Sequence, residues 1–339
     1  MTPVQSEPAY GDIATRRADI RDRLRSAAVD GLSAVLEGPR ARGAFLVRCL
    51  MGAPFALRIA DEVPLSLTAV VSGRPWAVPD GAPPVALAPG DVVVALGVPH
   101  WTIADAASTP VTATIMPGQQ CVAPDGRRLT EEYDLGVRSW GNDPAGETVL
   151  LSGSYLLEGE VSRRLLRSLP PLFVVNEAEL GSPLIGLLDA EIVRAEPGQD
   201  AVLDRLLDLL LIAVLRAWFS RPDARPPGWY VALGDEVAGP ALRLMQERPE
   251  ESWTVEDLAA AAHVSRAAFA RRFAALVGEP PLTFLTRWRL ALAADLLADP
   301  GITLEAVARQ VGYGTPFALS TAFKREYGVS PREFRSRAG

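Results

Sequence analysis

The sequence is poor in cysteine and contains no long apolar run. Two cysteines among 339 residues, Cys49 and Cys121, cannot form the disulfide framework of a secreted scaffold, and they fit the reducing cytosol. The longest uninterrupted apolar stretch in the predicted helices runs from Leu209 to Leu215, far short of the ~18 residues that span a bilayer. The first 19 residues lack the apolar core of a signal peptide. We therefore expect a cytoplasmic protein that does not bind a membrane.

Charge is distributed unevenly along the chain. The net charge of −7 argues against a nucleic-acid binder when the chain is taken as a whole. From His263 to Gly339, however, ten Arg and one Lys stand against six acidic residues, a net of +5, so the preceding 262 residues carry −12. This contrast predicts two domains, an acidic one that repels DNA and a basic one that carries a contact surface.

A helix-turn-helix pattern occurs twice in the basic segment. In each copy a short helix ends at an apolar pair, 258–259 or 307–308, and a turn leads to a second helix with apolar residues at i, i+4 and i+8. These residues are Phe269, Phe273 and Val277 in the first copy and Leu319, Phe323 and Tyr327 in the second. The same shift of 50 residues relates Ser265 to Thr315, and each can cap its second helix. Two short helices joined in this way can set a recognition helix into a DNA major groove.

A long helix is predicted between the two copies, over residues 282–298. Pro280-Pro281 precede it and Pro300-Gly301 end it. Its apolar stripe consists of Phe284, Leu285, Trp288, Leu292, Leu296 and Leu297. About 17 residues at ~1.5 Å each span roughly 25 Å. Such a rod can hold two recognition helices one DNA turn apart, ~34 Å.

Residues 253–335 resemble the DNA-binding domain of the AraC/XylS family of bacterial transcription regulators. The matching positions are Trp253 to Ala259, Val264-Ser265, Phe269, Arg271, Phe273, Gly278, Pro281, Arg289, Ala293, Leu297, Val307-Ala308, Gly312-Tyr313, Leu319-Ser320, Phe323-Lys324, Gly328, Ser330-Pro331 and Phe334-Arg335. The resemblance implies that residues 235–339 bind an asymmetric site on double-stranded promoter DNA, and that RNA polymerase is a partner if the protein is an activator. One departure is His263, where the family often has Gly; we expect a turn residue with positive φ there, not a ligand.

The exposed face of the first recognition helix gives one group of candidate DNA contacts. It comprises Ser265, Arg266, Ala267, Ala270 and Arg271. The resemblance places base-reading positions at Ala267, Ala270 and Arg271, and among these only Arg271 has hydrogen-bond donors. Arg271 is therefore the candidate for bidentate contact with guanine, or alternatively a phosphate contact. The neighbouring Arg272 lies about 100° round the helix, where it can pair with an acid.

The second recognition helix gives a face with fewer donors. Its candidate contacts are Thr315, Pro316, Phe317, Ser320, Thr321, Lys324 and Arg325. Pro316 suits the first turn of a helix. Phe317 can meet a thymine methyl or pack inside, and packing is the preferred interpretation. Lys324 and Arg325 are expected to contact phosphates, so the first unit should carry more of the sequence readout.

The first half of the chain predicts a β-barrel or sandwich followed by helices. Its expected strands are Ala44–Leu50, Phe55–Ile59, Leu65–Val71, Val92–Leu96, Val111–Ile115 and Thr148–Leu156. The turn Leu87-Ala-Pro-Gly-Asp91 before a strand, followed by Pro99-His100, resembles the second half of a cupin motif. Residues from about 29 to 220 are similar to the cupin-type sensor of one AraC subgroup. The expected fold is α+β and multidomain: a disordered segment 1–19, a cupin-like barrel with helices over 20–219 that serves sensing and dimerisation, a linker over 220–234, and an all-α domain of two helix-turn-helix units over 235–339.

Histidine is almost missing from this half, which contains only His100. Enzymatic cupins hold a metal with several His plus a carboxylate, so we expect no metal, no cofactor and no catalytic residue. His100 is expected to bond a backbone group at a strand end; alternatively it lines an effector pocket with Trp76, Trp101 and Tyr133. A cupin enzyme fused to a DNA-binding domain therefore ranks third among the candidate functions.

Cys49 and Cys121 offer a second sensing hypothesis, a thiol-based redox regulator. A reactive thiol needs exposure and a nearby positive group. Arg48 is adjacent, but strand alternation points it to the opposite face from Cys49. The preferred interpretation is two small buried hydrophobic residues.

The last helix before the linker, over 201–219, has a wide apolar face that must be covered. The barrel, another helix or a second subunit can cover it, and a homodimer contact through Leu207 and Leu210 is the third of these alternatives. The Pro-rich segment 220–234 is the expected linker. The function that accounts for both halves is a sequence-specific transcription regulator controlled by a small-molecule effector in the barrel.

Overall fold

The computed structural model describes the chain except for residues 1–44, 98–99, 156–158, 162–165, 167 and 339. The segment predicted to be disordered, 1–19, lies outside the described residues. So do residues 20–36, over which the sequence pattern predicts a helix. The rest falls into two compact units that divide between Pro227 and Gly228. We call residues 35–227 the β-sheet unit and residues 228–339 the helical unit, and describe each by itself.

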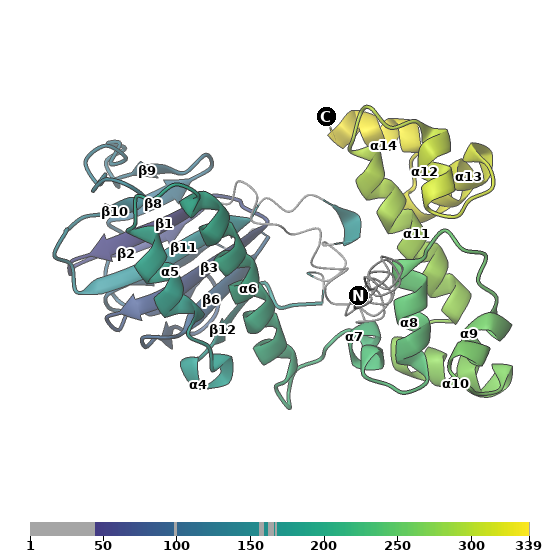
Figure 1. Cartoon of the computed structure of the whole chain (residues 1–339). Helices are drawn as coiled ribbons and strands as arrows, with labels where there is room; N and C mark the ends of the chain where they lie inside the picture. The colour runs from purple at the N-terminus through teal and green to yellow at the C-terminus, as the bar shows by residue number, and fades with distance from the viewer. Residues whose placement is uncertain (1–44, 98–99, 156–158, 162–165, 167, 339) are drawn as a thin grey trace, which may run out of the picture. The chain divides into compact units, whose positions relative to one another are not determined.

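The β-sheet unit contains two six-stranded sheets (Figure 1). In spatial order the first sheet consists of β10 (Ser139–Gly141), β1 (Phe45–Met51), β11 (Thr148–Tyr155), β3 (Leu65–Ser72), β6 (Val92–Leu96) and β12 (Leu172–Val175). The second consists of β5 (Val85–Ala86), β4 (Trp76–Pro79), β7 (Trp101–Ala104), β2 (Ala56–Ile59), β8 (Ala113–Met116) and β9 (Gln120–Val122). All six strands expected from the sequence are present. The other strands are mostly short, so their period-2 pattern spans too few residues to be recognised.

Strand alternation separates the interior of this unit from its outer face. On β1, Cys49 and Met51 join a core cluster that contains residues of both sheets, while Arg48 points outward to the carboxylate of Asp189 at 2.7 Å. On β11, Leu150 faces the core and Gly153 approaches the outer helices. The core therefore lies between the two sheets, with one outer face left for helices.

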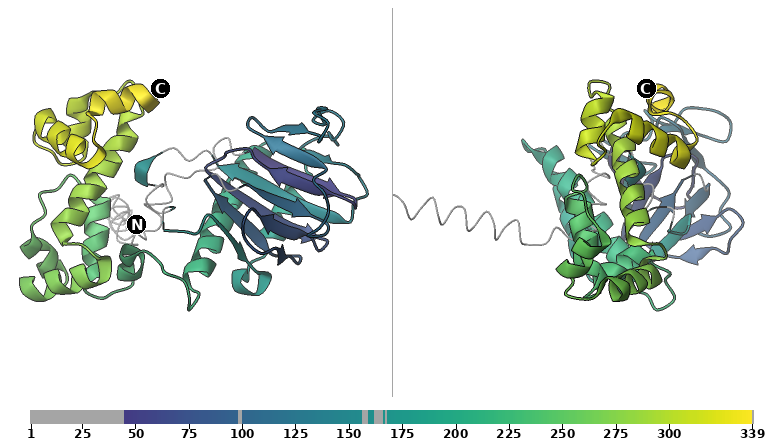
Figure 2. Two further views of the ribbon diagram at one scale, coloured as in Figure 1. Left: turned by 180° about the vertical axis from the view of Figure 1, so that it is seen from behind. Right: turned by 90° about the vertical axis from the view of Figure 1, so that its right-hand side faces the viewer.

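Three helices follow the sheets: α4 (Glu177–Leu180), α5 (Leu184–Ile192) and α6 (Gln199–Phe219). Helix α5 contacts β1, β3 and β11, and α6 contacts β12, so both cover the first sheet. Figure 1 shows them in front of that sheet, and the view from behind in Figure 2 shows the strands in front of them. The sequence pattern also predicts a helix over residues 161–169, a range that falls largely outside the described residues.

The broad apolar face of α6 packs inside its own unit. Leu207 is 2% exposed and Leu210 is 1% exposed. A Cβ on Gly153 would lie 2.9 Å from the Leu207 side chain, and the Tyr155 hydroxyl donates to the Leu207 carbonyl oxygen at 2.7 Å. The expectation that Leu207 and Leu210 form a dimer contact was therefore wrong, because both side chains are buried within the β-sheet unit itself.

The helical unit consists of eight helices among its described residues. They are α7 (Gly228–Leu233), α8 (Ala238–Glu247), α9 (Val255–Ala261), α10 (Arg266–Val277), α11 (Pro281–Leu297), α12 (Leu304–Gln310), α13 (Pro316–Tyr327) and α14 (Pro331–Ala338). Helix α11 is the long helix predicted between the repeats, and it contacts α8, α10, α12, α13 and α14. Across the described residues of the whole chain, no helix is both long and apolar enough to cross a membrane.

Helix α7 lies within the range expected to be linker, 220–234. Its buried residues Trp229 and Ala232 pack into the helical unit, where α7 contacts α8 and α10. A Cβ on Gly228 would come within 2.3 Å of the Leu276 carbonyl oxygen, so the start of α7 approaches the end of α10 very closely. The apolar anchors of α7 thus extend the helical unit back to Gly228.

Candidate DNA-binding surface and sensor cavity

Side-chain caps start the helices of both helix-turn-helix units. The Thr254 side chain caps α9 in a capping box with Asp257, and Thr303 caps α12. The caps expected for the second helices are confirmed: Ser265 accepts from the Ala268 amide at 3.3 Å and Thr315 from the Ala318 amide at 3.1 Å. Each cap satisfies an amide that has no partner within the helix, which fixes where each second helix begins.

The turns of the two units differ by one residue. His263 has φ of 56° and Gly312 has φ of 77°, so the expected positive φ at His263 is confirmed. The residue after each donates to the first helix, from Val264 to the Ala259 carbonyl at 3.1 Å and from Tyr313 to that of Ala308 at 2.8 Å. The first helices are therefore 49 residues apart and the second helices 50 apart, because Gly314 adds one residue to the second turn.

Helix α10 exposes its candidate DNA contacts while Phe269 and Phe273 are buried beneath it. Arg266 and Ala267 are exposed and Ala270 is half-buried. The Arg266 guanidinium lies 2.8 Å from the Glu256 carboxylate in an exposed ion pair.

Two neighbouring arginines of α10 differ in their partners. The Arg272 guanidinium lies 2.6 Å from the Asp235 carboxylate, so the expected pairing with an acid is confirmed. Arg271 is exposed and forms no ion pair or hydrogen bond with any residue in the described part of the chain. Its guanidinium is therefore available to a base or a phosphate.

Helix α13 presents a different surface. Phe317 is 81% exposed, so the expectation that it packs inside was wrong. The reason is its place on the helix: Leu319 and Phe323 occupy the buried face and fill the core below it. Pro316 stands in the first turn, as expected.

The remaining candidate contacts of α13 surround Phe317 and the last turn. Thr321 is exposed, and its hydroxyl donates to the Phe317 carbonyl at 3.0 Å. Ser320 is half-buried, and Lys324 and Arg325 are exposed in the last turn. This surface thus combines an aromatic ring with two cations and few other donors.

Arg289 on α11 has a structural role, because its side chain bonds to the backbone of a distant segment. It donates to the carbonyl oxygens of Pro249 and Glu251, each at 2.6 Å, and burial lowers its pKa. These bonds fix α11 to the segment before α9. Sequence reasoning missed this role, because Arg289 is one of several polar residues on α11 and its carbonyl partners lie about 40 residues earlier in the chain.

A cavity of about 320 Å³ lies between the two sheets of the β-sheet unit. Apolar residues form most of its wall, among them the rings of Trp101 and Trp140. Its polar lining residues are Asp61, Ser66, Thr68, Gln119, Thr130 and Ser152. A cavity of this size is at the lower end of the roughly 300–1,000 Å³ typical of small-molecule sites.

Only one of the four residues expected to line an effector pocket does so. Trp101 lines the cavity, whereas Tyr133 packs on Trp140 with ring centroids 5.0 Å apart. His100 lies beside a separate, very small cavity. Trp76 stands opposite Ala104 on β7, one residue out of phase with the inward-facing Ala77, so it faces away.

The missed lining residues include two polar side chains on β3. Ser66 and Thr68 are buried and alternate in phase with the inward-facing Val70. Inward polar residues on an apolar strand are the signal that could have found this cavity.

Both cysteines line this cavity, from β1 and β9. Burial raises the pKa of Cys49 to about 12 and that of Cys121 to about 11. Arg48 points away from the cavity and pairs with Asp189, as alternation predicts. Both thiols are therefore protonated at neutral pH and are poor nucleophiles.

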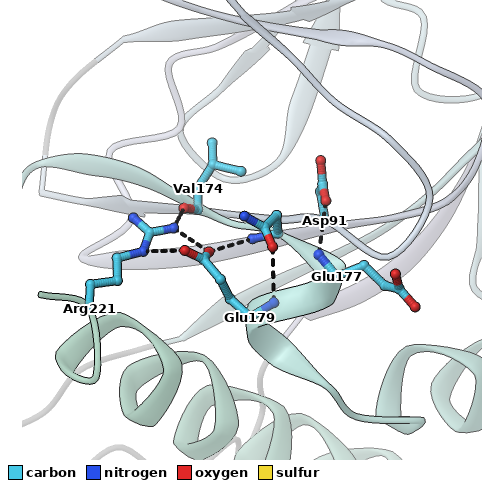
Figure 3. Close-up of polar contacts among 6 residues, drawn as sticks. Asp91, Val174, Glu177, Glu179 and Arg221 are labelled. Atoms are coloured by element: carbon cyan, nitrogen blue, oxygen red, sulfur yellow. Dashed lines mark hydrogen bonds and ion pairs between the residues drawn. The ribbon is translucent and has the colours of Figure 1, made fainter.

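The end of α6 is tied to the edge of the first sheet (Figure 3). Arg221 donates from Nε to Glu179 at 2.9 Å and from Nη2 to the Val174 carbonyl of β12 at 2.6 Å. Its guanidinium also stacks over the Trp218 ring at 4.3 Å. Arg221 holds the pKa of Glu179 below its usual value. The last residues of the unit before the helical unit are thus anchored to β12.

Asp91, directly before β6, links that strand to the start of α4. It accepts from the amide of Ala88 at 2.9 Å and from that of Glu177, at the start of α4, at 3.1 Å (Figure 3). Within the described residues, no group of three or more His, Cys, Asp or Glu side chains could hold a metal ion.

Comparison with known proteins assigns each unit to a family. Residues 30–220 match the cupin family and residues 258–337 match the helix-turn-helix domain family. A putative AraC-like transcription regulator of Streptomyces lividans is 31% identical over 312 residues, which are 91% of this chain and 98% of the relative. One of Streptomyces antibioticus is 34% identical over 230 residues, 67% of this chain and 75% of the relative.

A solved structure is similar to part of the helical unit. The DNA-binding domain of AdpA in complex with a target DNA is 35% identical, covers 31% of this chain and 93% of its own, and has a TM-score of 0.29. The match to the Streptomyces lividans regulator covers 91% of this chain, so it extends through both units. The chain therefore belongs to the AraC-like transcription regulators, and it is a DNA-binding protein that joins a cupin domain to a helix-turn-helix domain.

Proposed function

We propose that this regulator changes its DNA binding when a small molecule occupies the cavity between its two sheets. The observation that carries the proposal is the cavity itself, about 320 Å³ with a mostly apolar wall, in the unit joined to the DNA-binding unit. The protein would act in the cytoplasm, with RNA polymerase as a partner if it is an activator. An effector can shift binding only through different affinities for two states of the protein.

On DNA, α10 and α13 would each enter a major groove. Arg271 is the base-reading candidate because its exposed guanidinium has no partner among the described residues, and Ser265, Arg266, Ala267 and Ala270 surround it.

On α13, Phe317 would contact a thymine methyl, while Lys324 and Arg325 would bind phosphates. Thr315, Pro316, Ser320 and Thr321 complete that face. Because the two faces differ, one subunit should cover an asymmetric site with its groove contacts ~10 bp apart.

The effector signal would leave the cavity through the first sheet. Ser66 and Thr68 on β3 line the cavity, β3 pairs with β6, and β6 pairs with β12. Strand β12 in turn holds Arg221 through the Val174 carbonyl. A change in the cavity would therefore reach the residues where the chain leaves this unit.

A second copy of the chain is the proposed partner of the exposed side of α5 and α6. Val202 and Leu209 on α6 are 44% and 49% exposed, and Leu187 on α5 is 51% exposed. Linking two DNA-binding units raises their effective concentration on adjacent sites. The overall affinity for DNA with two half-sites can then exceed that of a single unit by ~10²–10⁴-fold. Changing both Val202 and Leu209 to Gln should yield a monomer with weaker binding to two-half-site DNA. Arg205→Gln on the same helix is the control, and unchanged sedimentation of the double variant would exclude this interface.

The experiment that tests effector control begins with the protein's own binding sites. Genome-wide mapping of full-length protein supplies a natural site, and its affinity is then measured against a small-molecule library. We expect at least one compound to change the affinity, and Thr68→Leu, which fills the cavity, to abolish that change while leaving compound-free binding intact. Compounds that act equally on wild type and Thr68→Leu would show that the cavity is not the effector site.

Thiol sensing is the second candidate, favoured by one observation. Cys49 and Cys121 line the same cavity, from facing sheets. Their raised pKa values oppose it, since reactive sensors use thiolates. Replacement of both by Ser should leave the DNA-binding response to the small molecule intact; loss of the response to an oxidant in that variant, with the wild type responding, would favour thiol sensing instead.

A further inference from the structure

The wall of the cavity has a distinctive electrostatic composition. Among its described lining residues none is Lys, Arg or His. The chain's one lysine, Lys324, lies in the other unit. A carboxylate or phosphate entering this cavity would therefore lose its water without gaining a cationic partner, which is strongly unfavourable.

One carboxylate lies in the wall, so a cation would meet a smaller penalty than an anion. Among the described lining residues it is Asp61, which accepts from the Gln119 amide at 3.1 Å. The two thiols are protonated because burial raises their pKa. The remaining polar groups are hydroxyls, on Ser66 and Thr68 among others, which orient a ligand without selecting a charge.

One buried donor in this wall has no partner. The Nε1 atom of Trp101 is buried and forms no hydrogen bond with any residue in the described part of the chain. Trp101 is 1% exposed, and it lines both this cavity and the very small cavity beside His100. Leaving an indole N–H unsatisfied costs free energy, and a carbonyl or ether oxygen on a ligand would remove that cost.

We propose that the cavity binds an uncharged, mainly apolar molecule with a hydrogen-bond acceptor that takes the Trp101 N–H. This rests on the proposed function, since it names the chemical class of the effector of the same site. The rings of Trp101 and Trp140 supply the flat walls that suit an aromatic or otherwise planar body.

Three probes of one shape and different charge test the ligand class. They are 2-acetylnaphthalene, which is neutral with an acceptor, 2-naphthoate, which is anionic, and 2-naphthylmethylammonium, which is cationic. Titration calorimetry with full-length protein should show that the ketone binds most tightly, and that the anion binds more weakly by roughly 100-fold or more. Equal or tighter binding of the anion or the cation, or no binding of the ketone, would overturn the proposal.

The Trp101 donor is tested with a fourth probe, 2-ethylnaphthalene, which has no acceptor. Trp101→Phe keeps a ring and removes the N–H. It should therefore weaken the binding of the ketone by about 3–10-fold and leave the binding of the ethyl compound nearly unchanged. Trp76→Phe is the matched control, because Trp76 faces away from the cavity. If Trp101→Phe weakens both probes equally, the donor role is wrong.

These assays measure occupancy of the cavity and not DNA binding. Tight binding of the ketone with unchanged DNA affinity would therefore count against effector control while supporting the ligand class. Tight binding of 2-naphthoate with altered DNA affinity would support effector control and count against the proposed ligand class.

Discussion

The two helix-turn-helix units share a scaffold but place their cations differently. With the 50-residue shift between second helices, Arg271 and Arg272 of α10 correspond to Thr321 and Ala322 of α13, while the cations of α13 stand one turn later, at 324 and 325. Ala267 corresponds to the exposed Phe317. The buried positions are equivalent and the exposed ones are not. The same face of the second helix thus forms the core in both units, while the two outer faces present different side chains to DNA.

The largest expected effect tests the equivalence of the two cores. Phe273 and Phe323 are fully buried at matching positions. Phe273→Ala and Phe323→Ala should each lower the free energy of unfolding of the helical unit by about 3–5 kcal/mol. Denaturant titration of the full chain, followed by circular dichroism, measures this. If one variant loses less than ~1 kcal/mol of the free energy of unfolding while the other loses the expected amount, the two cores are not equivalent.

The next prediction concerns the turns, where the two units differ. A Cβ on Gly312 would lie 2.8 Å from the carbonyl oxygens of Glu250 and Pro249, and its φ is positive, so Gly312→Ala should destabilise by about 1–3 kcal/mol. His263 is exposed and adopts positive φ without glycine. His263→Gly should therefore be neutral or slightly stabilising, by up to ~1 kcal/mol, in the same titration. A large loss for His263→Gly would mean that its side chain has a role that the fold does not reveal.

Sequence patterns located the helical unit closely. The predicted helix over 282–298 is observed as Pro281–Leu297, because proline and glycine mark its ends, and Ser265 and Thr315 cap the helices as expected. Phe317 was misjudged because apolar character alone does not tell which face of a helix a side chain occupies.

The cavity could not be predicted in the same way. Its lining residues come from strands of both sheets and meet only through strand pairing, which the sequence does not specify. Trp101 and Trp76 looked alike in sequence, yet register turns only Trp101 inward. The same reason explains Leu207 and Leu210: periodicity predicted a wide apolar face but could not tell whether a sheet or a second subunit covers it.

A third prediction separates the recognition roles of the two helices. Arg271→Ala should weaken binding to the natural site by ~1–3 kcal/mol and relax the base preference at one position. Lys324→Ala should weaken specific and random DNA alike and reduce the salt slope by about one unit, since a phosphate contact releases one counterion. Fluorescence anisotropy over a salt series with both DNAs compares them. If Arg271→Ala weakens binding to both DNAs equally, Arg271 contacts a phosphate and not a base.

The smallest expected effect concerns an ion pair that α10 has and that α13 cannot form at the matching position, Ala322. The hydrogen bond from Arg272 holds the pKa of Asp235 below its usual value, and Asp235 also accepts from the amides of Val237 and Ala238. A carboxyl group whose pKa is lower in the folded state stabilises the fold above its unfolded pKa, ~3.9, and this contribution is lost as pH falls through the folded value.

Asp235→Asn should therefore cost about 1 kcal/mol at pH 7, mainly through the lost ion pair with Arg272 and the weakened hydrogen bonds to the amides of Val237 and Ala238. Its difference from wild type should shrink as pH falls below ~4, where the wild-type carboxyl group also becomes neutral. Thermal unfolding of the full chain between pH 3 and 7 measures the difference, with Glu256→Gln as the control, since the Glu256–Arg266 pair is exposed and contributes little. A difference that is constant over this range would show that the charge of Asp235 does not contribute to the stability of the helical unit.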